Sequence, residues 1–280
     1  MPIRLVAIDL DGTLLNSQSE LSQTNRQALV VASARGVQFI VVTGRRFHSA
    51  QPIVQQIPFP VTLISSNGAH IGSSSGQVVR RDFLPRKTAR QVLEIAREYR
   101  PHAVAIFDVA ERGQVVMQTG ASPEGPLSWY LKKYPEFLAL VPELEAALDT
   151  DPVQIMFGGP PGEMEPIETL LHASRVGASV HLTWTKYFSR NMSILDVMNR
   201  GCSKGGALKF WAERNGIHPS EIMAIGDNYN DLEMLQFSGC PVLMGNCTPG
   251  LAQGDWPLTL SNDQDGVAAA LHSYVLSSRE

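Results

Sequence analysis

The sequence has no long apolar segment and little net charge, and each absence excludes a class of protein. No stretch of the chain approaches the ~20 apolar residues that a membrane-spanning helix needs. The net charge of −4, from 23 basic and 27 acidic side chains, gives no excess of positive charge for binding a nucleic-acid backbone. We therefore expect neither a membrane nor a nucleic acid as a partner.

Cysteine is also scarce. The chain contains three cysteines, Cys202, Cys240 and Cys247, an odd number whose spacing matches no zinc site. We expect them to be free thiols in a reducing compartment. The N-terminal residues MPIRLVAIDLDG carry an apolar run that is too short for a signal peptide and ends in acids. Both observations favour a cytoplasmic protein. The sequence carries no signal for its oligomeric state.

Short apolar segments alternate with helical patterns near both ends of the chain, which has 280 residues, enough for one large or two ordinary domains. Residues 4–10 and 37–44 predict strands, and residues 61–70 predict a strand that runs into a turn. Residues 24–35 predict a helix that Gly36 ends. The strand segments are almost continuously apolar, as in parallel sheets that helices cover on both faces. The pattern predicts an α/β fold with a doubly wound, Rossmann-like parallel sheet.

The pattern changes in the middle of the chain, where proline and glycine become frequent. Residues 103–108 and 114–119 have the spacing of a β-hairpin. Further strands are predicted at 153–158 and 179–184, with a helix at 163–173 between them. We therefore predict an α+β domain inserted at residues 84–188.

The α/β pattern then returns. A strand is predicted at 193–198, a helix at 203–215 and another buried strand at 222–227. The predicted core domain therefore consists of residues 1–83 and 189–280, interrupted by the insert.

Two aspartates follow the first apolar strand, in the stretch IDLDGTLL. Asp9 and Asp11 are separated by one residue and precede Gly12 and Thr13. Like charges this close repel each other, and burying them is costly unless a cation pairs with them. The pair therefore indicates either a cation site or a site of chemistry.

Four polar clusters lie where strands end or helices begin, at the edge where open α/β sheets bind ligands. They are Asp9–Thr13, Thr43-Gly44-Arg45, Lys204 and the segment from Gly226 to Asp231. Three acids suit Mg²⁺, which prefers oxygen ligands, while a lysine and a threonine can hold phosphate oxygens. One carboxylate then remains as a nucleophile and another as an acid and base. This inventory indicates phosphoryl transfer.

The motifs DxDGT, TGR, SNGA, SKG and GDxxND occur in this order along nearly the whole chain. In that order they resemble the haloacid dehalogenase-like superfamily, and within it the Cof-type phosphatases, whose α+β cap (type IIB) lies between the second and third motifs. The stretches MGNC and SNDQDGVAAAL are also similar to that subfamily, which more often has Ala where Cys247 stands.

The resemblance implies a role for each matching residue. Asp9 would attack phosphorus and bind Mg²⁺, and Asp11 would act as acid and base while its backbone carbonyl binds the metal. Asp227 would be the third metal ligand, and Asp231 would orient Lys204 or a metal-bound water. Lys204 would neutralise charge on the nucleophile and the phosphate. Substrate contacts would come from Thr43, Gly44, Arg45, Asn67, Lys204 and Asn230, although Asn67 also fits an ordinary turn and Arg45 an ordinary surface arginine.

The leading hypothesis is a Mg²⁺-dependent phosphatase for a small phosphorylated metabolite, with a sugar phosphate as the expected substrate. A sugar-phosphate mutase is the first alternative, since mutases share this cap class. A non-enzymatic phospho-acceptor switch is the second. Asp11 argues against a switch, because it would speed hydrolysis of the phosphorylated aspartate.

Overall fold

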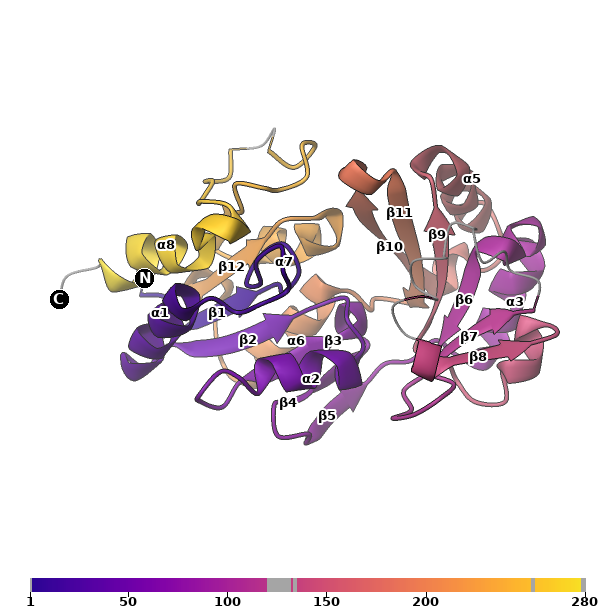
Figure 1. Ribbon diagram of the computed structural model, residues 1–280, viewed down its shortest axis with the longest axis horizontal. Helices are drawn as coiled ribbons and strands as arrows, with labels where there is room; N and C mark the ends of the chain where they lie inside the picture. Colours follow the sequence, from indigo (N-terminus) through magenta and orange to yellow (C-terminus); the bar gives the residue numbers. More distant parts are fainter. Residues whose placement is uncertain (1, 120–131, 133–134, 253–254, 278–280) are drawn as a thin grey trace. The chain divides into compact units, whose positions relative to one another are not determined.

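The computed structural model describes residues 2–119, 132, 135–252 and 255–277, and it consists of two compact units (Figure 1). The first unit comprises Met1–Arg81 and Ser203–Glu280, and the second comprises Asp82–Cys202. The second unit therefore continues past residue 188, where the sequence placed the return to the core domain. Each unit has its own sheet and its own apolar core.

A seven-stranded sheet forms the centre of the first unit, in the order β13-β12-β1-β2-β3-β4-β5. Its first five strands are parallel, as predicted: β13 (Cys240–Leu243), β12 (Ile222–Gly226), β1 (Leu5–Ile8), β2 (Gln38–Val42) and β3 (Thr62–Ser65). In register, Ile8 of β1 lies between Val41 of β2 and Ile225 of β12. The carboxyl ends of these central strands therefore meet at one edge of the sheet.

Helices cover both faces of this sheet. Alternate residues of β1 enter different cores, with Val6 and Ile8 in one and Leu5 and Ala7 in the other. The first core also takes residues from α1 (Gln23–Ala34), α2 (Phe47–Val54) and α8 (Gly266–Leu271), which continues as a π-helical turn, His272–Leu276. The second takes residues from α6 (Lys204–Arg214) and α7 (Leu232–Phe237). The doubly wound arrangement predicted from the sequence is thus confirmed.

The strand predicted at 61–70 runs into a turn, as expected. The chain leaves β3 at Ser65 and makes a 3-10 turn, Ser66–Gly68, in which Ser66 and Asn67 both have positive φ. It then returns as β4 (His70–Ser73) and β5 (Val78–Arg81), two antiparallel strands that extend the sheet. This hairpin was not predictable from the sequence, because its strands have four residues each and β5 is largely exposed.

The second unit contains a six-stranded sheet in the order β10-β11-β9-β6-β7-β8. Its strands are β6 (Ala103–Ile106), β7 (Val115–Gln118), β8 (Leu138–Val141), β9 (Gln154–Gly159), β10 (Val180–Tyr187) and β11 (Met192–Asn199). The predicted hairpin is confirmed, since Ala105 pairs with Val116 in antiparallel register. The core of this unit also takes residues from α3 (Arg86–Ile95) and α5 (Pro161–His172).

The strand predicted at 193–198 exists as β11, but it does not belong to the first sheet. It pairs along its length with β10 and also with β9, both in the second unit. A buried strand of this composition fits either sheet, so its apolar pattern did not reveal its partners.

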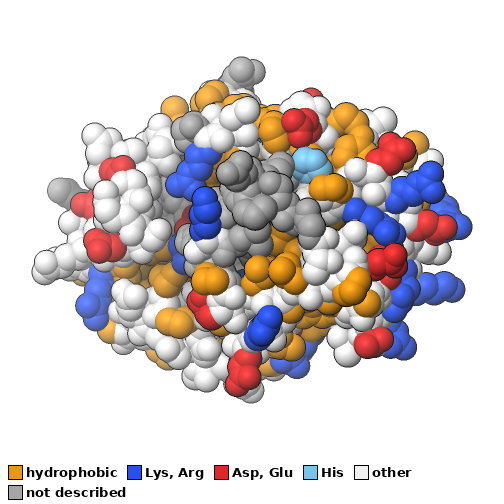
Figure 2. Space-filling view, turned by 45° about the vertical axis from the view of Figure 1, so that its right-hand side comes forward, with side chains coloured by type: hydrophobic (Ala, Val, Ile, Leu, Met, Phe, Trp, Pro, Cys, Tyr) orange, Lys and Arg blue, Asp and Glu red, His pale blue; other side chains and the backbone are white. Residues whose placement is uncertain are grey.

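Several 3-10 segments connect these elements: Arg97–His102, Pro135–Phe137, Leu144–Ala147, Gly177–Ser179, Phe188–Arg190, Pro219–Glu221, Tyr229–Asp231 and Asn262–Gln264. Among the helices of the described residues, none is long and apolar enough to cross a membrane. On the face shown in Figure 2, acidic and basic side chains are mixed with hydrophobic and uncharged ones, in keeping with the small net charge.

Candidate active site

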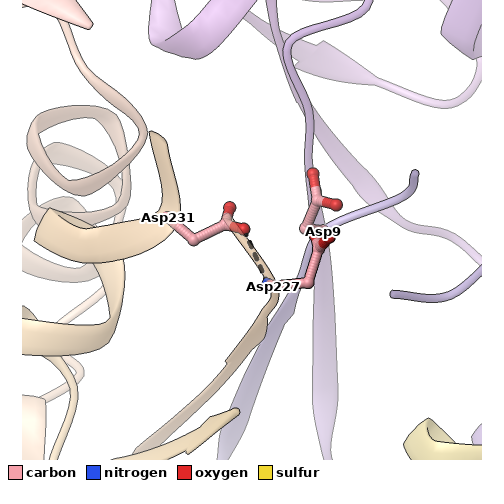
Figure 3. Close-up of side chains that lie close together, drawn as sticks. All are labelled: Asp9, Asp227 and Asp231. Atoms are coloured by element: carbon pink, nitrogen blue, oxygen red, sulfur yellow. Dashed lines mark hydrogen bonds between the residues drawn. The ribbon is translucent and has the colours of Figure 1, made fainter. Parts of the chain in front are cut away.

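Two acidic residues leave adjacent strands side by side at the carboxyl edge of the first sheet. Asp9 directly follows β1 and Asp227 directly follows β12, and the Asp9 amide donates to the carbonyl of Ile225 at 3.1 Å. Because the strands are parallel neighbours, both side chains emerge at the same edge, as Figure 3 shows. The geometry therefore brings together the DxDGT motif, which carries Asp9, and the GDxxND motif, which carries Asp227, as expected from the sequence.

A buried lysine joins the acids. The Lys204 ammonium lies 2.6 Å from Asp9 Oδ1 and 2.7 Å from Asp231 Oδ1. Lys204 is 1% exposed, and Asp9 and Asp231 are buried with it. Ser203 caps the helix that begins with Lys204, accepting from the Gly206 amide at 3.0 Å. A lysine in this position is retained by its ionic partners, because a buried ammonium without them would lose most of its hydration energy uncompensated.

Asp231 is held on both of its oxygens. Oδ1 accepts from Lys204, while Oδ2 accepts the backbone amide of Asn228 at 3.1 Å and that of Asp227 at 2.9 Å. Figure 3 shows the bond between Asp231 and Asp227. Asp231 lies in the 3-10 turn Tyr229–Asp231, four residues after Asp227, so it closes the loop that carries Asp227. Its carboxylate therefore fixes both the lysine and the start of this loop.

The acidic cluster fits a divalent cation by its donors and its charge. Asp9, Asp227 and Asp231 each place a carboxylate oxygen within 4.8 Å of the others. Three ionised carboxylates beside one lysine leave two negative charges on these four side chains, which a dication would balance. Since Asp231 already binds Lys204 and two amides, Asp9 and Asp227 are the carboxylates better disposed to be metal ligands. Hard oxygen donors of this kind suit Mg²⁺.

Burial perturbs the ionisation of the whole cluster. It raises the pKa of Asp9 to about 7, against the opposing attraction of Lys204 and with a further rise from Asp231. Burial, followed by the nearby charge of Asp9, raises the pKa of Asp227 well above its ordinary value. Burial alone would lower the pKa of Lys204, but Asp231 and Asp9 together raise it. The lysine therefore stays charged, and the two acids would ionise fully only with more positive charge nearby.

The loop after β1 packs closely on Asp227. Thr13 Oγ1 donates to Asp227 Oδ1 at 3.3 Å. Gly12 has φ +82°, and a Cβ atom there would overlap Asp227 Oδ2. Glycine is required on both counts, since the left-handed backbone and the missing side chain are each needed at this point.

Asp11 is more exposed than the clustered acids and binds an arginine. Arg45 Nε lies 2.6 Å from Asp11 Oδ2, and its terminal nitrogen lies 2.5 Å from Oδ1. The side chain of Asp11 is 43% exposed, in contrast to buried Asp9. Two parallel charge-assisted hydrogen bonds fix the plane of a carboxylate as well as its position. The sequence indicated that Arg45 is either a substrate contact or a surface arginine, and it did not predict this pairing.

The other predicted substrate contacts form a second polar group nearby in the same unit. Thr43 is 1% exposed, and its Oγ1 accepts the amide of Arg45 at 3.1 Å. The backbone amide of Asn67 donates to the Thr43 carbonyl at 3.0 Å. The side-chain oxygen of Asn67, Oδ1, accepts from Asn230 Nδ2 at 3.1 Å. A Cβ atom on Gly44 would lie 3.1 Å from that same Asn67 oxygen. The turn at Asn67 is thus tied to both neighbouring motifs.

One residue of the site escaped the sequence analysis. Asn246 Nδ2 donates to the carbonyl of Gly12 at 2.8 Å, so it touches the loop that carries Asp11. The only signal was the similarity of the MGNC stretch to the Cof-type subfamily, which does not say what the asparagine does.

Comparison with known proteins agrees with this geometry. The family model described as haloacid dehalogenase-like hydrolase matches residues 6–271. An HMP-PP phosphatase of Serratia proteamaculans is 31% identical over 249 residues, which cover 89% of this chain and 86% of the relative. The pyridoxal phosphate phosphatase YbhA of Escherichia coli is 26% identical over 282 residues, covering 99% of this chain and 100% of the relative.

A solved structure shows the same fold over the same length. BT1666 of Bacteroides thetaiotaomicron, a phosphatase of the same superfamily, superposes with a TM-score of 0.80 at 26% identity, covering 98% of this chain and 95% of BT1666. The ordered motifs, the buried acidic cluster and these matches lead to one assignment. The chain belongs to the haloacid dehalogenase-like hydrolases of the Cof type, and it is a phosphoric monoester hydrolase.

Proposed function

We propose that the protein is a Mg²⁺-dependent phosphatase that hydrolyses a small phosphorylated metabolite through a phosphoryl-Asp9 intermediate. The observation that carries the proposal is the contact between buried Asp9 and buried Lys204, beside the second carboxylate of Asp227. Lys204 orients this buried carboxylate and favours its ionised form, and a bound dication would favour that form further, as a carboxylate nucleophile requires.

The chemistry divides into two displacements. An Asp9 carboxylate oxygen forms a bond to phosphorus while the bond from phosphorus to the ester oxygen breaks, and Asp11 gives its proton to the departing oxygen. Water then attacks the phosphoryl group and passes a proton to Asp11, so that phosphate leaves and Asp9 is restored. Splitting one difficult step into two easier ones suits phosphate monoesters, which hydrolyse extremely slowly unaided.

The remaining residues would hold the phosphoryl group and the metal. Lys204 would offset negative charge on the transferred group, and Thr43 and Asn230 would hydrogen-bond its oxygens. Mg²⁺ would be held by the carboxylates of Asp9 and Asp227 and by the Asp11 carbonyl. When bound, the ion would neutralise charge on the nucleophile and the phosphoryl oxygens.

The proposed substrate is small. The two relatives above are named for pyridoxal phosphate and HMP-PP, both small phosphorylated molecules. For this chain we propose a sugar phosphate, met in the cytoplasm, with the second unit acting as the cap that excludes water and selects the leaving group.

The test is phosphate release from a panel of phosphorylated metabolites, with Mg²⁺ and with EDTA. We expect the wild-type protein to release phosphate with Mg²⁺ but not with EDTA, and the Asp9→Asn variant to release none in either case. The matched control is Asp255→Asn, an exposed aspartate of the same unit, which should behave as wild type. Normal Mg²⁺-dependent release by Asp9→Asn would overturn the proposal.

The products separate the alternatives. Free phosphate supports hydrolysis, whereas an isomerised sugar phosphate would identify a mutase. A long-lived phosphorylated Asp9 without turnover would identify a phospho-acceptor switch.

A further inference from the structure

The segment after β13 touches both of the loops that carry the acids. Asn246 Nδ2 donates to the Gly12 carbonyl at 2.8 Å, and two residues later the Thr248 amide donates to the Asp227 carbonyl at 2.8 Å. The Met244 amide also donates to the Gly226 carbonyl at 3.1 Å. Residues 244–248 therefore bridge the loop after β1 and the loop after β12, within one unit.

Asn246 is itself held in place. Its Oδ1 accepts the backbone amide of Asn262 at 2.8 Å. The Asn262 side chain then donates to the Leu15 carbonyl at 2.9 Å, further along the same loop. Asn246 and Asn262, from separate C-terminal segments, thus grip the loop after β1: their side chains bind two of its carbonyls, those of Gly12 and Leu15. The side-chain amide of Asn246 donates and accepts at once, as only an amide side chain of this length can do here, while Asn262 donates through both its backbone and its side chain.

The carbonyl that Asn246 binds belongs to a residue in close contact with Asp227. Gly12 follows Asp11 directly, and it packs so closely on Asp227 that a Cβ atom would overlap that carboxylate. A rotation of the peptide between Gly12 and Thr13 would therefore displace Thr13, whose hydroxyl binds Asp227, and change the path of the loop that leads from Asp11. Misplacement of reacting groups by ~1 Å can cost on the order of 100-fold in rate.

We propose that Asn246 is a positioning residue of the phosphoryl-transfer site, which fixes the Gly12 carbonyl and so holds the Asp11 loop at a set distance from Asp227. The proposal rests on the function proposed above. It gives a role to the MGNC and SNDQDG stretches, whose asparagines form the grip. Asn246 acts through the backbone and touches none of the reacting atoms.

Two variants isolate the bond to Gly12. Asn246→Ala loses both the donor to Gly12 and the acceptor for Asn262. Asn246→Asp keeps the acceptor and loses the donor, while it adds a charge. Only the missing donor is common to both. The control pair is Asn215→Ala and Asn215→Asp, because Asn215 Nδ2 also donates to a backbone carbonyl, that of Trp211 at 2.8 Å, on an exposed helix end.

We expect kcat to fall about tenfold in both Asn246 variants, with KM changed less than about threefold, because placement and not substrate binding is lost. Asn246 is exposed, so both proteins should fold with melting temperatures close to wild type. The Asn215 variants should keep wild-type kcat. A kcat within about twofold of wild type in both Asn246 variants would overturn the proposal, as would a loss confined to one of them.

Hydrogen exchange tests the grip without any turnover. The amides of Thr13, Leu14 and Leu15 are hydrogen-bonded to carbonyls at residues 9 and 10, inside the gripped loop. In both Asn246 variants they should exchange about tenfold faster, and in the Asn215 variants they should not change. Unchanged exchange would overturn the proposal. If the wild-type enzyme released no phosphate, the proposed function would fail, while this readout would still decide whether Asn246 holds the loop.

Discussion

The ammonium of Lys204 lies between Asp9 and Asp231, 2.6 Å from one carboxylate and 2.7 Å from the other. Lys204 is the first residue of α6, where the helix dipole favours negative charge and disfavours a cation. A buried lysine at a helix N-terminus is therefore unfavourable by itself, and the two carboxylates offset the cost. Asp231 fixes the lysine from one side so that its charge is available to Asp9 on the other.

Replacing this lysine should damage both catalysis and stability. In Lys204→Met we expect kcat to fall on the order of 100- to 1,000-fold, as when one transition-state donor is removed. The free energy of unfolding should fall by about 3 kcal/mol, because two buried carboxylates lose their partner. Phosphate release and urea denaturation measure the two effects.

The control lies on the same helix. Lys209 is exposed, and its Nζ makes a weak surface ion pair with Glu213 Oε1 at 3.9 Å. Lys209→Met should therefore change the free energy of unfolding by about 0.5 kcal/mol or less. Equal losses in the two variants would show that the buried contact has no special role.

The sequence predicted the parts of this site that depend on strand ends. Asp9 and Asp227 each follow a buried apolar strand, so a parallel sheet places them at one edge. It did not predict that Asp231 would bind the amides of its own loop, since that depends on the 3-10 turn at Tyr229–Asp231. The pairing of Arg45 with Asp11 also depends on side-chain direction, which no spacing encodes.

For the fold as for the site, the sequence predicted where the apolar strands lie but not every contact that depends on tertiary packing. Long apolar strands such as β2 and β12 were predicted within a residue or two at their ends. β11 was found, but its neighbours were not, because hydrogen-bond partners in a sheet are chosen by tertiary packing. The hairpin of β4 and β5 was not predicted, because each strand has four residues, β4 is almost fully buried and β5 is almost fully exposed, so neither shows an alternation of apolar and polar residues.

Gly12 should tolerate no side chain. In Gly12→Ala we expect a strong loss of kcat, because the new methyl group overlaps Asp227 in addition to the strain of a positive φ. Gly36 has a similar φ, +86° against +82°, but nothing lies within 4 Å of a Cβ atom there. Gly36→Ala should therefore lose about 1 kcal/mol of stability and keep full activity. Phosphate release and thermal unfolding of Gly12→Ala and Gly36→Ala separate the effect of backbone strain, which both variants have, from that of the overlap with Asp227, which only Gly12→Ala has. A fully active Gly12→Ala variant would contradict the close packing of Gly12 on Asp227.

Arg45 should matter for activity more than for stability. Lysine is a point charge and cannot bind both oxygens of Asp11 in the way the guanidinium does. In Arg45→Lys we expect kcat to fall about tenfold and the free energy of unfolding to change by less than about 1 kcal/mol. Arg4→Lys is the control, because one terminal nitrogen of Arg4 binds both oxygens of Glu221, at 3.1 and 3.2 Å, and a lysine can replace a contact made by a single nitrogen. The idea fails if steady-state kinetics show the same kcat in both variants.

The stabilisation of the protein by Mg²⁺ should grow as the pH rises. The pKa of Asp9 is about 7 in the folded chain, against an ordinary value of 3.8, so between these values the folded state holds more protons than the unfolded state. The free energy of unfolding without metal then falls as the pH rises through this range, and the loss from this carboxyl is complete above the folded pKa. A dication binds the ionised carboxylates and removes that penalty.

Thermal unfolding with Mg²⁺ and with EDTA, at about pH 5 and about pH 8, measures the effect. We expect the rise in melting temperature on adding Mg²⁺ to be larger at the higher pH, because protons compete with the metal for Asp9 and Asp227 at the lower one. In Asp9→Asn this carboxyl no longer titrates, so the difference between the two pH values should shrink. An equal Mg²⁺ effect at both pH values in the wild-type protein would mean that the ion binds away from these acids.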